Sequence, residues 1–340
     1  MLDASHTLKG RFPAFQTARP TGAAQWDRDK ARLDRTIRRL LGDWPSLFVP
    51  QASVLDTDAR HDCIVERFAF DNGVGDTVYG LILIPAGRTE PGPAVLYNHW
   101  HADDYELGKD EILTRVHPDL GFATGEQLVQ AGYVVLCIDA YGFGERRFQG
   151  PAGGKEHGAA VEAALFKTFL WEGRTLWGMM VRDDMLALNY LASRPEVNPG
   201  RIAAMGVSMG STRTWWLAAL DDRIRVAVCV ACLTRYQNLI ARGAVNAHGI
   251  YYYVPNMLRE GIDAESVVGL IAPRPLLTLT GDRDEGSPVD GVQTINAFQE
   301  HLYRLHGLPE NFRGRLYPGV GHAYTRDMWR ETMDWLRTHL

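Results

Sequence analysis

The 340-residue sequence lacks the features that mark several classes of protein. It contains no run of about 18 uncharged apolar residues, the length that a membrane-spanning helix needs, so we expect no membrane partner. Its first residues show no apolar core of a secretory signal, which favours a cytoplasmic location. Lys and Arg number 36 against 41 Asp and Glu, so the chain has no basic excess for binding nucleic acid. A small molecule is the expected partner.

Cysteine is also scarce. The four cysteines, Cys63, Cys137, Cys229 and Cys232, are too few for a disulfide framework. Cys229 and Cys232 have the spacing of a redox pair, but they lie in the apolar run IRVAVCVACL, which is typical of a buried strand. A reactive pair needs an exposed position, so we interpret these residues as buried structural thiols.

The remaining composition is that of a soluble globular protein. Apolar residues make up 46% and charged residues 23% of the chain, and no internal repeat is present. The length favours one enlarged α/β domain with insertions over two large domains. The sequence leaves the oligomeric state open, with a homodimer as one option because it is the commonest assembly among soluble oligomers.

The order of the expected elements predicts an α/β-hydrolase fold. Residues 1–59 should form an N-terminal arm that packs on the body, with an amphipathic helix over 25–42. The catalytic domain, 60–340, begins with antiparallel strands and continues with alternating strands and helices, which indicates a mostly parallel sheet with helices on both faces. Insertions near 145–178 and 233–268 follow strand ends and should form a small lid. Strands are expected at 63–70, 77–85, 93–100, 133–140, 198–208, 224–232, 274–282 and 313–319, and helices at 124–132, 179–195, 209–220, 289–306 and 326–340.

The sharpest local motif is Gly206-Val207-Ser208-Met209-Gly210, a G-x-S-x-G string between a predicted strand and a predicted helix. In such a sharp turn, a side chain at either glycine would collide with the neighbouring strand and helix. The serine hydroxyl then projects at the start of a helix, where partial positive charge favours a developing anion. The motif predicts that Ser208 is a nucleophile.

A serine nucleophile needs a base and an orienting acid. His322 lies in YPGVGHAYT, between the last predicted strand and the last predicted helix. Asp284 follows the strand LLTLTG in the turn DRDEGSP; Asp282 and Glu285 in this turn and Asp290 just after it are competing acids. The resulting order, Ser208 then Asp284 then His322, is the order of the α/β-hydrolase triad.

The chain resembles α/β-hydrolases of the dienelactone hydrolase and acetyl xylan esterase-like group. The resemblance covers about residues 60–340 and depends on LYNHWHADDYELGKDE, IDAYGFGER, RPEVNPGRIAAMGVSMGS, LIAPRPLLTLTGDRDEGSP and YPGVGHAYT. It implies a nucleophile at 208, an acid at 284 and a base at 322. Dienelactone hydrolases proper use cysteine as the nucleophile, whereas this chain has serine. The resemblance therefore implies a serine carboxylesterase without a cofactor or metal, with acetylated sugars as one substrate class.

Two backbone N–H groups should form the oxyanion hole. One belongs to Met209, directly after the nucleophile, and the other to Trp100 or His101 in the loop after an earlier strand. The usual His-Gly pattern is absent there, because Trp100 replaces the glycine.

Three alternative functions are compatible with the sequence. A peptidase or amidase of the prolyl oligopeptidase-like kind shares this fold and triad, although no propeller precedes the catalytic part. A catalytically silent hydrolase fold could bind ligands, although it would have no reason to keep all three triad residues. His99 and His101 have the H-x-H spacing of a zinc site. Zinc needs three or four converging ligands, however, and the chain has no later pair of histidines in matching places. We therefore expect no metal.

Aromatic residues of the two insertions are candidates for the substrate pocket, because Tyr and Trp combine a flat apolar face with a polar tip. The predicted substrate-binding residues are Trp177, His248, Tyr251 and Tyr252.

Overall fold

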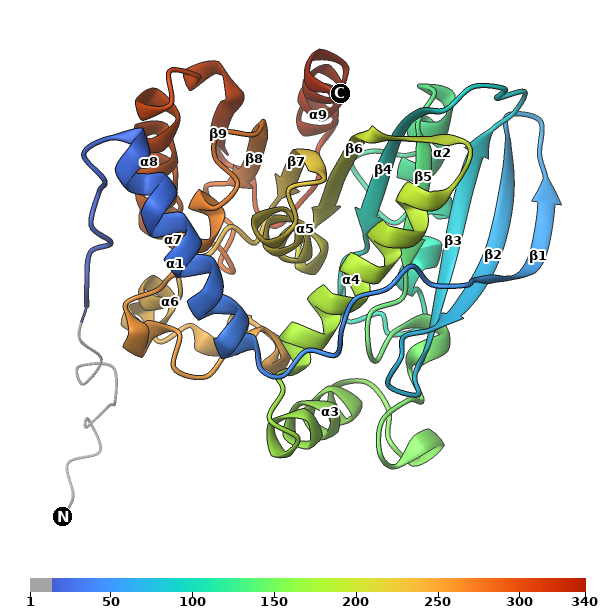
Figure 1. The fold of residues 1–340 in the computed structure, drawn as a ribbon, viewed down its shortest axis with the longest axis horizontal. Helices are drawn as coiled ribbons and strands as arrows, with labels where there is room; N and C mark the ends of the chain where they lie inside the picture. Colours follow the sequence, from blue (N-terminus) through green and yellow to red (C-terminus); the bar gives the residue numbers. More distant parts are fainter. Residues whose placement is uncertain (1–13) are drawn as a thin grey trace.

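A computed structural model describes residues 14–340, so the first 13 residues of the predicted N-terminal arm lie outside the described part. The centre of the fold is a nine-stranded sheet in the order β1-β2-β3-β5-β4-β6-β7-β8-β9 (Figure 1). Strands β1 to β3 and the β3–β5 pair are antiparallel, and all other neighbours are parallel. This topology confirms the predicted α/β-hydrolase fold class. The strands are β1 (Ser53–Ala59), β2 (Cys63–Asp71), β3 (Thr77–Pro85), β4 (Gly92–Asn98), β5 (Val134–Ile138), β6 (Val197–Val207), β7 (Ile224–Val230), β8 (Leu276–Gly281) and β9 (Phe312–Tyr317).

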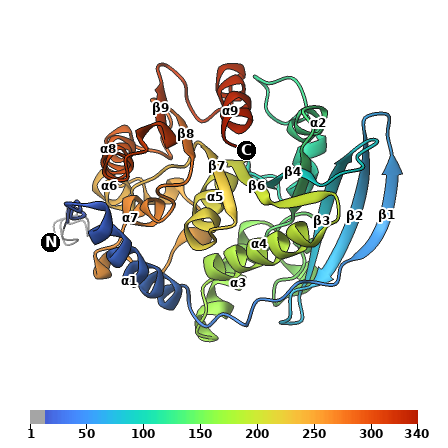
Figure 2. The ribbon, with the colours of Figure 1, turned by 45° about the horizontal axis from the view of Figure 1, so that its top comes forward.

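Helices cover both faces of the sheet. Helices α2 and α9 pack on one face, and α1, α3, α4, α5, α7 and α8 contribute to the core on the other (Figure 2). None of the helices in the described part of the chain is long and apolar enough to cross a membrane. The helices are α1 (Ala23–Leu41), α2 (Thr124–Gln130), α3 (Ala159–Trp171), α4 (Leu176–Ser193), α5 (Met209–Leu220), α6 (Tyr236–Arg242), α7 (Ala264–Gly269), α8 (Val289–Leu305) and α9 (Arg326–His339).

Alternation of side chains along the central strands divides the core in two. In β4, Ala94 and Leu96 point to the face with α4 and α5, whereas Val95 and Tyr97 point to the face with α2 and α9. All four side chains are fully buried, because successive residues of a strand face opposite sides and both sides are covered. The continuous apolar runs in the sequence follow from this double coverage.

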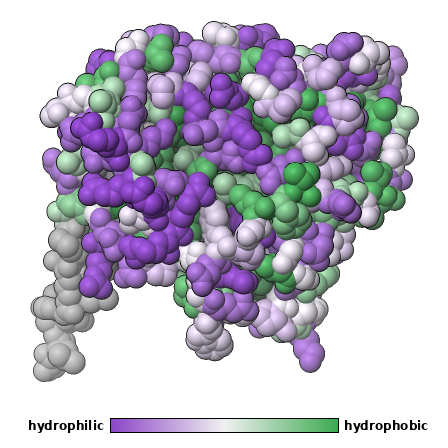
Figure 3. Space-filling model, viewed as in Figure 1, coloured by the Kyte–Doolittle hydropathy of each residue, from purple (hydrophilic) through white to green (hydrophobic). Residues whose placement is uncertain are grey.

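Strand β1 was not expected. It lies within the segment 1–59, which we predicted to be an arm, yet it pairs with β2 at the edge of the sheet. Every residue of SVLDTDA in β1 is exposed, so no alternation of apolar and polar residues announces the strand. The amphipathic helix predicted in the same segment is α1, whose outer side is hydrophilic on the molecular surface (Figure 3).

The two predicted insertions contain helices of their own. The first holds α3, and the second holds α6 followed by short 3-10 turns. Both α3 and α6 lie on the lower side of the molecule in Figure 1. The segment 145–178 is not a separate unit, since α4 already begins at Leu176 and passes into the core.

Candidate active site

The G-x-S-x-G motif forms a sharp turn between β6 and α5. Ser208 has φ 58° and ψ −120°, a conformation that non-glycine residues rarely adopt. A Cβ on Gly206 would lie 2.5 Å from the Asn98 carbonyl oxygen, and one on Gly210 would lie 1.9 Å from the same atom. Glycine is therefore required at both positions, because β4 ends directly against the turn. The packing holds Ser208 above the carboxyl end of β6.

The three residues predicted as a triad lie within hydrogen-bond distance of one another. Ser208 Oγ is 2.8 Å from His322 Nε2, and His322 Nδ1 is 2.9 Å from Asp284 Oδ2. Residues from three separate loops, after β6, β8 and β9, meet here because the carboxyl ends of neighbouring parallel strands share one edge of the sheet.

Asp284 differs from its competitors in burial and in its partners. Its residue is 4% exposed, and its second carboxylate oxygen accepts the Gly286 N–H at 3.0 Å. Two of the competing acids have other partners: Asp282 accepts the Gly319 N–H, and Asp290 pairs with an arginine, Arg242. Only Asp284 of this group contacts His322 within the described residues.

The surroundings of His322 favour its protonated form. Burial alone would lower the pKa of this imidazole, but the hydrogen bond and the negative charge of Asp284 outweigh burial and raise the pKa above its ordinary value. The His322 side chain is still 39% exposed, so a molecule from solvent can reach it. These are properties expected of a general base.

The structure corrects one of the predicted oxyanion donors. The Trp100 N–H donates to Glu111 Oε2 at 2.6 Å, so this N–H is already occupied. Two of the predicted donors have no recorded acceptor in the described part of the chain: the His101 N–H and the Met209 N–H, which lies at the first position of α5. Helix starts leave such N–H groups free, so Met209 and His101 remain the candidate pair.

The two histidines of the H-x-H string use both ring nitrogens in other contacts. His99 is fully buried; its Nε2 accepts the Ala140 N–H at 3.0 Å and its Nδ1 donates to the Trp100 carbonyl at 2.7 Å. His101 Nε2 is 3.0 Å from Glu162 Oε1, and its Nδ1 accepts the Asp103 N–H. Across residues 14–340 no group of three or more His, Cys, Asp or Glu side chains could hold a metal ion.

The predicted substrate-binding residues are more deeply packed than expected. Trp177 is fully buried and its ring contacts Tyr252 and Trp216, so the prediction that it meets substrate is wrong for this conformation. Tyr251 and Tyr252 are 3% and 4% exposed, and Tyr251 stacks on the His101 ring. The aromatic residues form the packed wall of the insertion, because such large rings gain most from complete burial.

His248 also has a different position from the one predicted. Its ring is buried, and Nε2 lies 2.8 Å from the carbonyl oxygen of Gly286. Since the N–H of Gly286 binds the Asp284 carboxylate, His248 supports the loop that carries the acid. Burial lowers the pKa of His248, so the ring is neutral when it makes this contact.

Cys232 is a neighbour of Ser208 that sequence analysis did not place there. Its Sγ lies 3.7 Å from Ser208 Oγ, at the carboxyl end of β7. Ala231 and Cys232 both have left-handed backbone angles, with φ 58° and 50°, and Thr212 donates to the Cys232 carbonyl. All four cysteines are buried, among them Cys229 and Cys232 as predicted, and burial raises the pKa of the Cys232 thiol to about 12. This residue is therefore a neutral wall of the site.

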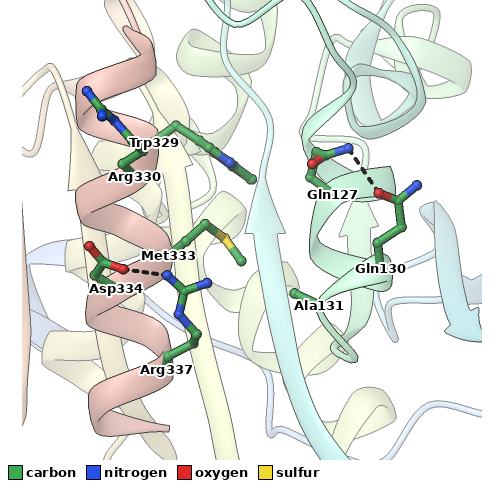
Figure 4. Close-up of a pocket in the computed structure, with 8 residues that line it drawn as sticks. All are labelled: Gln127, Gln130, Ala131, Trp329, Arg330, Met333, Asp334 and Arg337. Carbon is green, nitrogen blue, oxygen red and sulfur yellow. Dashed lines mark hydrogen bonds and ion pairs between the residues drawn. The ribbon is translucent and has the colours of Figure 1, made fainter.

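A surface groove of about 480 Å³ lies away from these residues. It separates α2 from α9, and Figure 4 shows the side chains of the two helices facing each other across it. The end of α2 lies where the chain enters β5, at the amino ends of the parallel strands. Ser208 lies at the opposite, carboxyl ends, so the groove is not part of the candidate active site. The lining residues are Gln127, Gln130, Ala131, Trp329, Arg330, Met333, Asp334 and Arg337.

Comparison with protein families agrees with this geometry. The model of the family described as "Dienelactone hydrolase family" matches residues 117–338, which include the carboxyl-end loops after β6, β8 and β9. The chain belongs to the dienelactone hydrolase family. The resemblance inferred from the sequence motifs is thereby confirmed, and this member of the family is a hydrolase.

Individual relatives match most or all of the chain. The Bacillus subtilis (strain 168) protein named "Putative hydrolase YtaP" is 34% identical over 311 residues, which cover 92% of this chain and 100% of that protein. Among solved structures, a protein from Bacteroides fragilis described as a "putative acetyl xylan esterase" has a TM-score of 0.75 at 17% identity, over 100% of this chain and 96% of the other. A glucuronoyl esterase from Solibacter usitatus has a TM-score of 0.67 at 15% identity, over 97% and 99%. At these identities, the two structures show a shared fold.

Proposed function

We propose that this hydrolase cleaves carboxylic esters through an acyl-enzyme formed on Ser208. The observation that carries the proposal is the continuous line of hydrogen bonds from Ser208 Oγ through His322 to Asp284. A serine hydroxyl is a poor nucleophile near neutral pH, and a positioned imidazole removes its proton as the new bond forms.

In the proposed mechanism His322 acts twice. Nε2 takes the proton of Ser208 as Oγ attacks the ester carbonyl, and the same proton then goes to the departing alcohol. Water attacks the acyl-enzyme with His322 again as base, which releases the carboxylic acid and restores the serine. Asp284 holds Nδ1–H, so Nε2 always faces the nucleophile, and it stabilises the imidazolium that forms.

The backbone N–H groups of Met209 and His101 are the proposed oxyanion donors. The carbonyl oxygen of the ester gains negative charge when Oγ attacks, and fixed donors stabilise that charge more strongly than the ground state. Met209 also lies at the amino end of α5, where the helix dipole favours an anion. This scheme needs no cofactor.

Short acyl groups suit the surroundings of Ser208. Cys232 Sγ lies 3.7 Å from Oγ, and Tyr251 stacks on the ring of His101 and packs against Tyr252, so we expect these side chains to limit the length of the acyl group. Solved structures of the same fold include proteins named as acetyl xylan and glucuronoyl esterases. We therefore propose small acyl esters, with acetylated sugars among them, as the substrate class.

The test is hydrolysis of p-nitrophenyl esters from acetate to octanoate by the wild type and by Ser208→Ala, each with and without a chelator. The proposal requires turnover that falls with acyl length, is abolished in the variant and is unaffected by the chelator. Mass spectrometry of the rapidly quenched reaction should find the acyl group on the peptide that contains Ser208. Turnover of an acyl amide without turnover of the matching ester would identify an amidase instead, and inertness toward both would contradict enzymatic ester cleavage.

A further inference from the structure

The oxyanion loop lacks the glycine that often gives such loops their freedom, yet one of its N–H groups must take a fixed direction. Trp100, in the middle of this loop, is held on both sides. Its N–H donates to Glu111 Oε2 at 2.6 Å, and its carbonyl oxygen accepts the Nδ1–H of His99 at 2.7 Å. Both peptide groups that flank Trp100 are therefore fixed by buried side chains.

Glu111 belongs to the 3-10 helix η2 (Gly108–Leu113) and is fully buried. Its other oxygen, Oε1, accepts the Tyr97 hydroxyl at 2.6 Å and lies 3.0 Å from His117 Nε2. A buried carboxylate is costly unless its oxygens are hydrogen-bonded, and here both oxygens have partners. No Arg or Lys in the described residues forms an ion pair with it, and there the Trp100 N–H is the only hydrogen-bond partner of Oε2.

The direction of the His101 N–H follows from these contacts. In a trans peptide the carbonyl and the N–H point in opposite directions, so a Trp100 carbonyl aimed at His99 turns the His101 N–H away from His99. The bond from the preceding N–H to Glu111 prevents the loop from rotating about Trp100. Charge-assisted hydrogen bonds of this kind are roughly twice as strong as neutral ones.

We infer that Glu111 is a positioning residue of the oxyanion hole: its carboxylate fixes the Trp100 backbone so that the next N–H, that of His101, faces the reacting carbonyl. The inference rests on the proposed ester cleavage at Ser208. Glu111 touches no substrate in this scheme, and its effect on the reaction passes entirely through the loop.

The experiment compares Glu111→Gln, the matched control Tyr97→Phe and the wild type on p-nitrophenyl acetate. Gln keeps the shape but offers the Trp100 N–H a neutral acceptor, whereas Tyr97→Phe removes a different donor from the same carboxylate. We expect kcat of Glu111→Gln to fall about tenfold or more, a fraction of the loss when an oxyanion donor is removed altogether. KM, the thermal midpoint and the acid-side pH midpoint of kcat should change little. Tyr97→Phe should retain kcat within about threefold, because the bond to Trp100 stays in place.

An aldehyde that forms a hemiacetal with Ser208 provides a second readout, since its bound form carries the oxyanion. Its inhibition constant should rise in Glu111→Gln by the same factor by which kcat falls. Unchanged kcat and unchanged inhibition would overturn the inference, as would equal losses in Glu111→Gln and Tyr97→Phe. If Glu111→Gln does not fold, Glu111→Asp replaces it: its charge is kept, but its carboxylate is one carbon farther from Trp100, and the same loss of kcat is expected. A wild type without esterase activity would refute both this inference and the proposed function, whereas an active wild type with an unaffected variant refutes only this one.

Discussion

On one side of Ser208 stands His322, whose side chain is 39% exposed and makes one hydrogen bond to each of two residues. On the other side, the loop of His99 to His101 is held by a fully buried histidine and a fully buried carboxylate. The first side contains the group proposed to move protons, and the second contains a donor that should not move at all. The comparison shows that histidine can serve either purpose, depending on what faces its two nitrogens.

His322 and His99 illustrate this directly. Asp284 and Ser208 face the nitrogens of His322, so the ring can take a proton at Nε2 and be stabilised at Nδ1. A backbone N–H and a backbone carbonyl face those of His99, and burial lowers the pKa of His99 well below its ordinary value. His99 is consequently neutral and confined to one tautomer.

The largest effect is expected from removing the proton-transfer group. His322→Ala should lower kcat about 10⁶-fold, because a triad acts as a unit and loses most of its effect with one member. The thermal midpoint should change little, since the side chain is partly exposed. Initial rates on p-nitrophenyl acetate measure the loss, and a variant that retains a tenth of the wild-type rate would assign the base to another residue.

Asp284→Asn should lower kcat about 10⁴-fold, because the amide cannot hold the Nδ1–H tautomer of His322. Asp282→Asn is the matched control, two positions away in the same loop, and in the described part of the chain the carboxylate of Asp282 accepts a hydrogen bond from the Gly319 N–H alone. The kcat of Asp282→Asn should stay within about threefold of the wild-type value, as expected when an exposed hydrogen bond is lost. A larger loss of kcat in Asp282→Asn than in Asp284→Asn would show that the acid has been assigned wrongly.

On the oxyanion side, two substitutions of His99 should separate catalysis from stability. The amide of His99→Gln reaches the position of Nε2 and can still accept the Ala140 N–H, but it loses the donor to Trp100. We expect a fall in kcat approaching 10²-fold, the lower range for loss of an oxyanion donor. His99→Asn keeps the donor near Nδ1, so it should retain kcat but lose about 1–3 kcal/mol of stability through the unpaired Ala140 N–H. Initial rates and chemical denaturation should be measured for both variants. Equal values of kcat and of stability in the two variants would contradict the separate roles assigned to the two ring nitrogens of His99.

The pH dependence of kcat/KM should report His322 alone. The base must be unprotonated to accept the serine proton, so activity falls as the pH drops through its pKa, tenfold for each unit below it. Asp284 raises that pKa, which places the midpoint above about 6.5. In Asp284→Asn the midpoint should move to lower pH, whereas His99→Gln should leave it unchanged. If the pH midpoint of kcat/KM shifted in His99→Gln, the loop of His99 to His101 would be coupled to the protonation of His322.

The smallest effect should come from Cys232, which touches Ser208 without belonging to either side. Cys232→Ala should keep kcat for the acetate ester within about threefold, because a thiol is a weak hydrogen-bond donor. The relative rate on butyrate should rise, since the removed sulfur atom opens space beside Oγ. A large loss on acetate would show instead that the thiol holds the nucleophile in its reactive rotamer.

The sequence predicted the parts of this site that have a steric or periodic signature. The two glycines around Ser208 and the short apolar runs of the central strands follow from local rules, so the elbow, most of the sheet and the order of the three triad residues could be anticipated. Strand β1 could not, because all of its residues are exposed and mostly polar. Both faces of this edge strand are exposed, so its side chains need no apolar alternation.

The burial of individual side chains was the second feature that the sequence could not predict. Glu111 lies in the charged run ELGKDE, which looks solvated, and only the tertiary fold shows that its carboxylate holds the Trp100 N–H. Trp177 gave the opposite error: an aromatic residue in an insertion suggested a pocket, but α4 carries it into the core. Local patterns do not reveal which polar side chains will find partners inside the protein.

The spacing of the triad has a consequence for the growing chain during synthesis. Ser208 and His322 are 114 positions apart, and β7, β8 and β9 must be added to the sheet between them. A ribosome that has completed the turn after β8 has already produced the nucleophile and the acid, but not the base. Since domains generally fold as units, the sheet that holds the elbow should be completed only when β9 is available. Incomplete chains released before the loop after β9 would contain Ser208 and Asp284 but lack His322, so they should be unable to cleave esters.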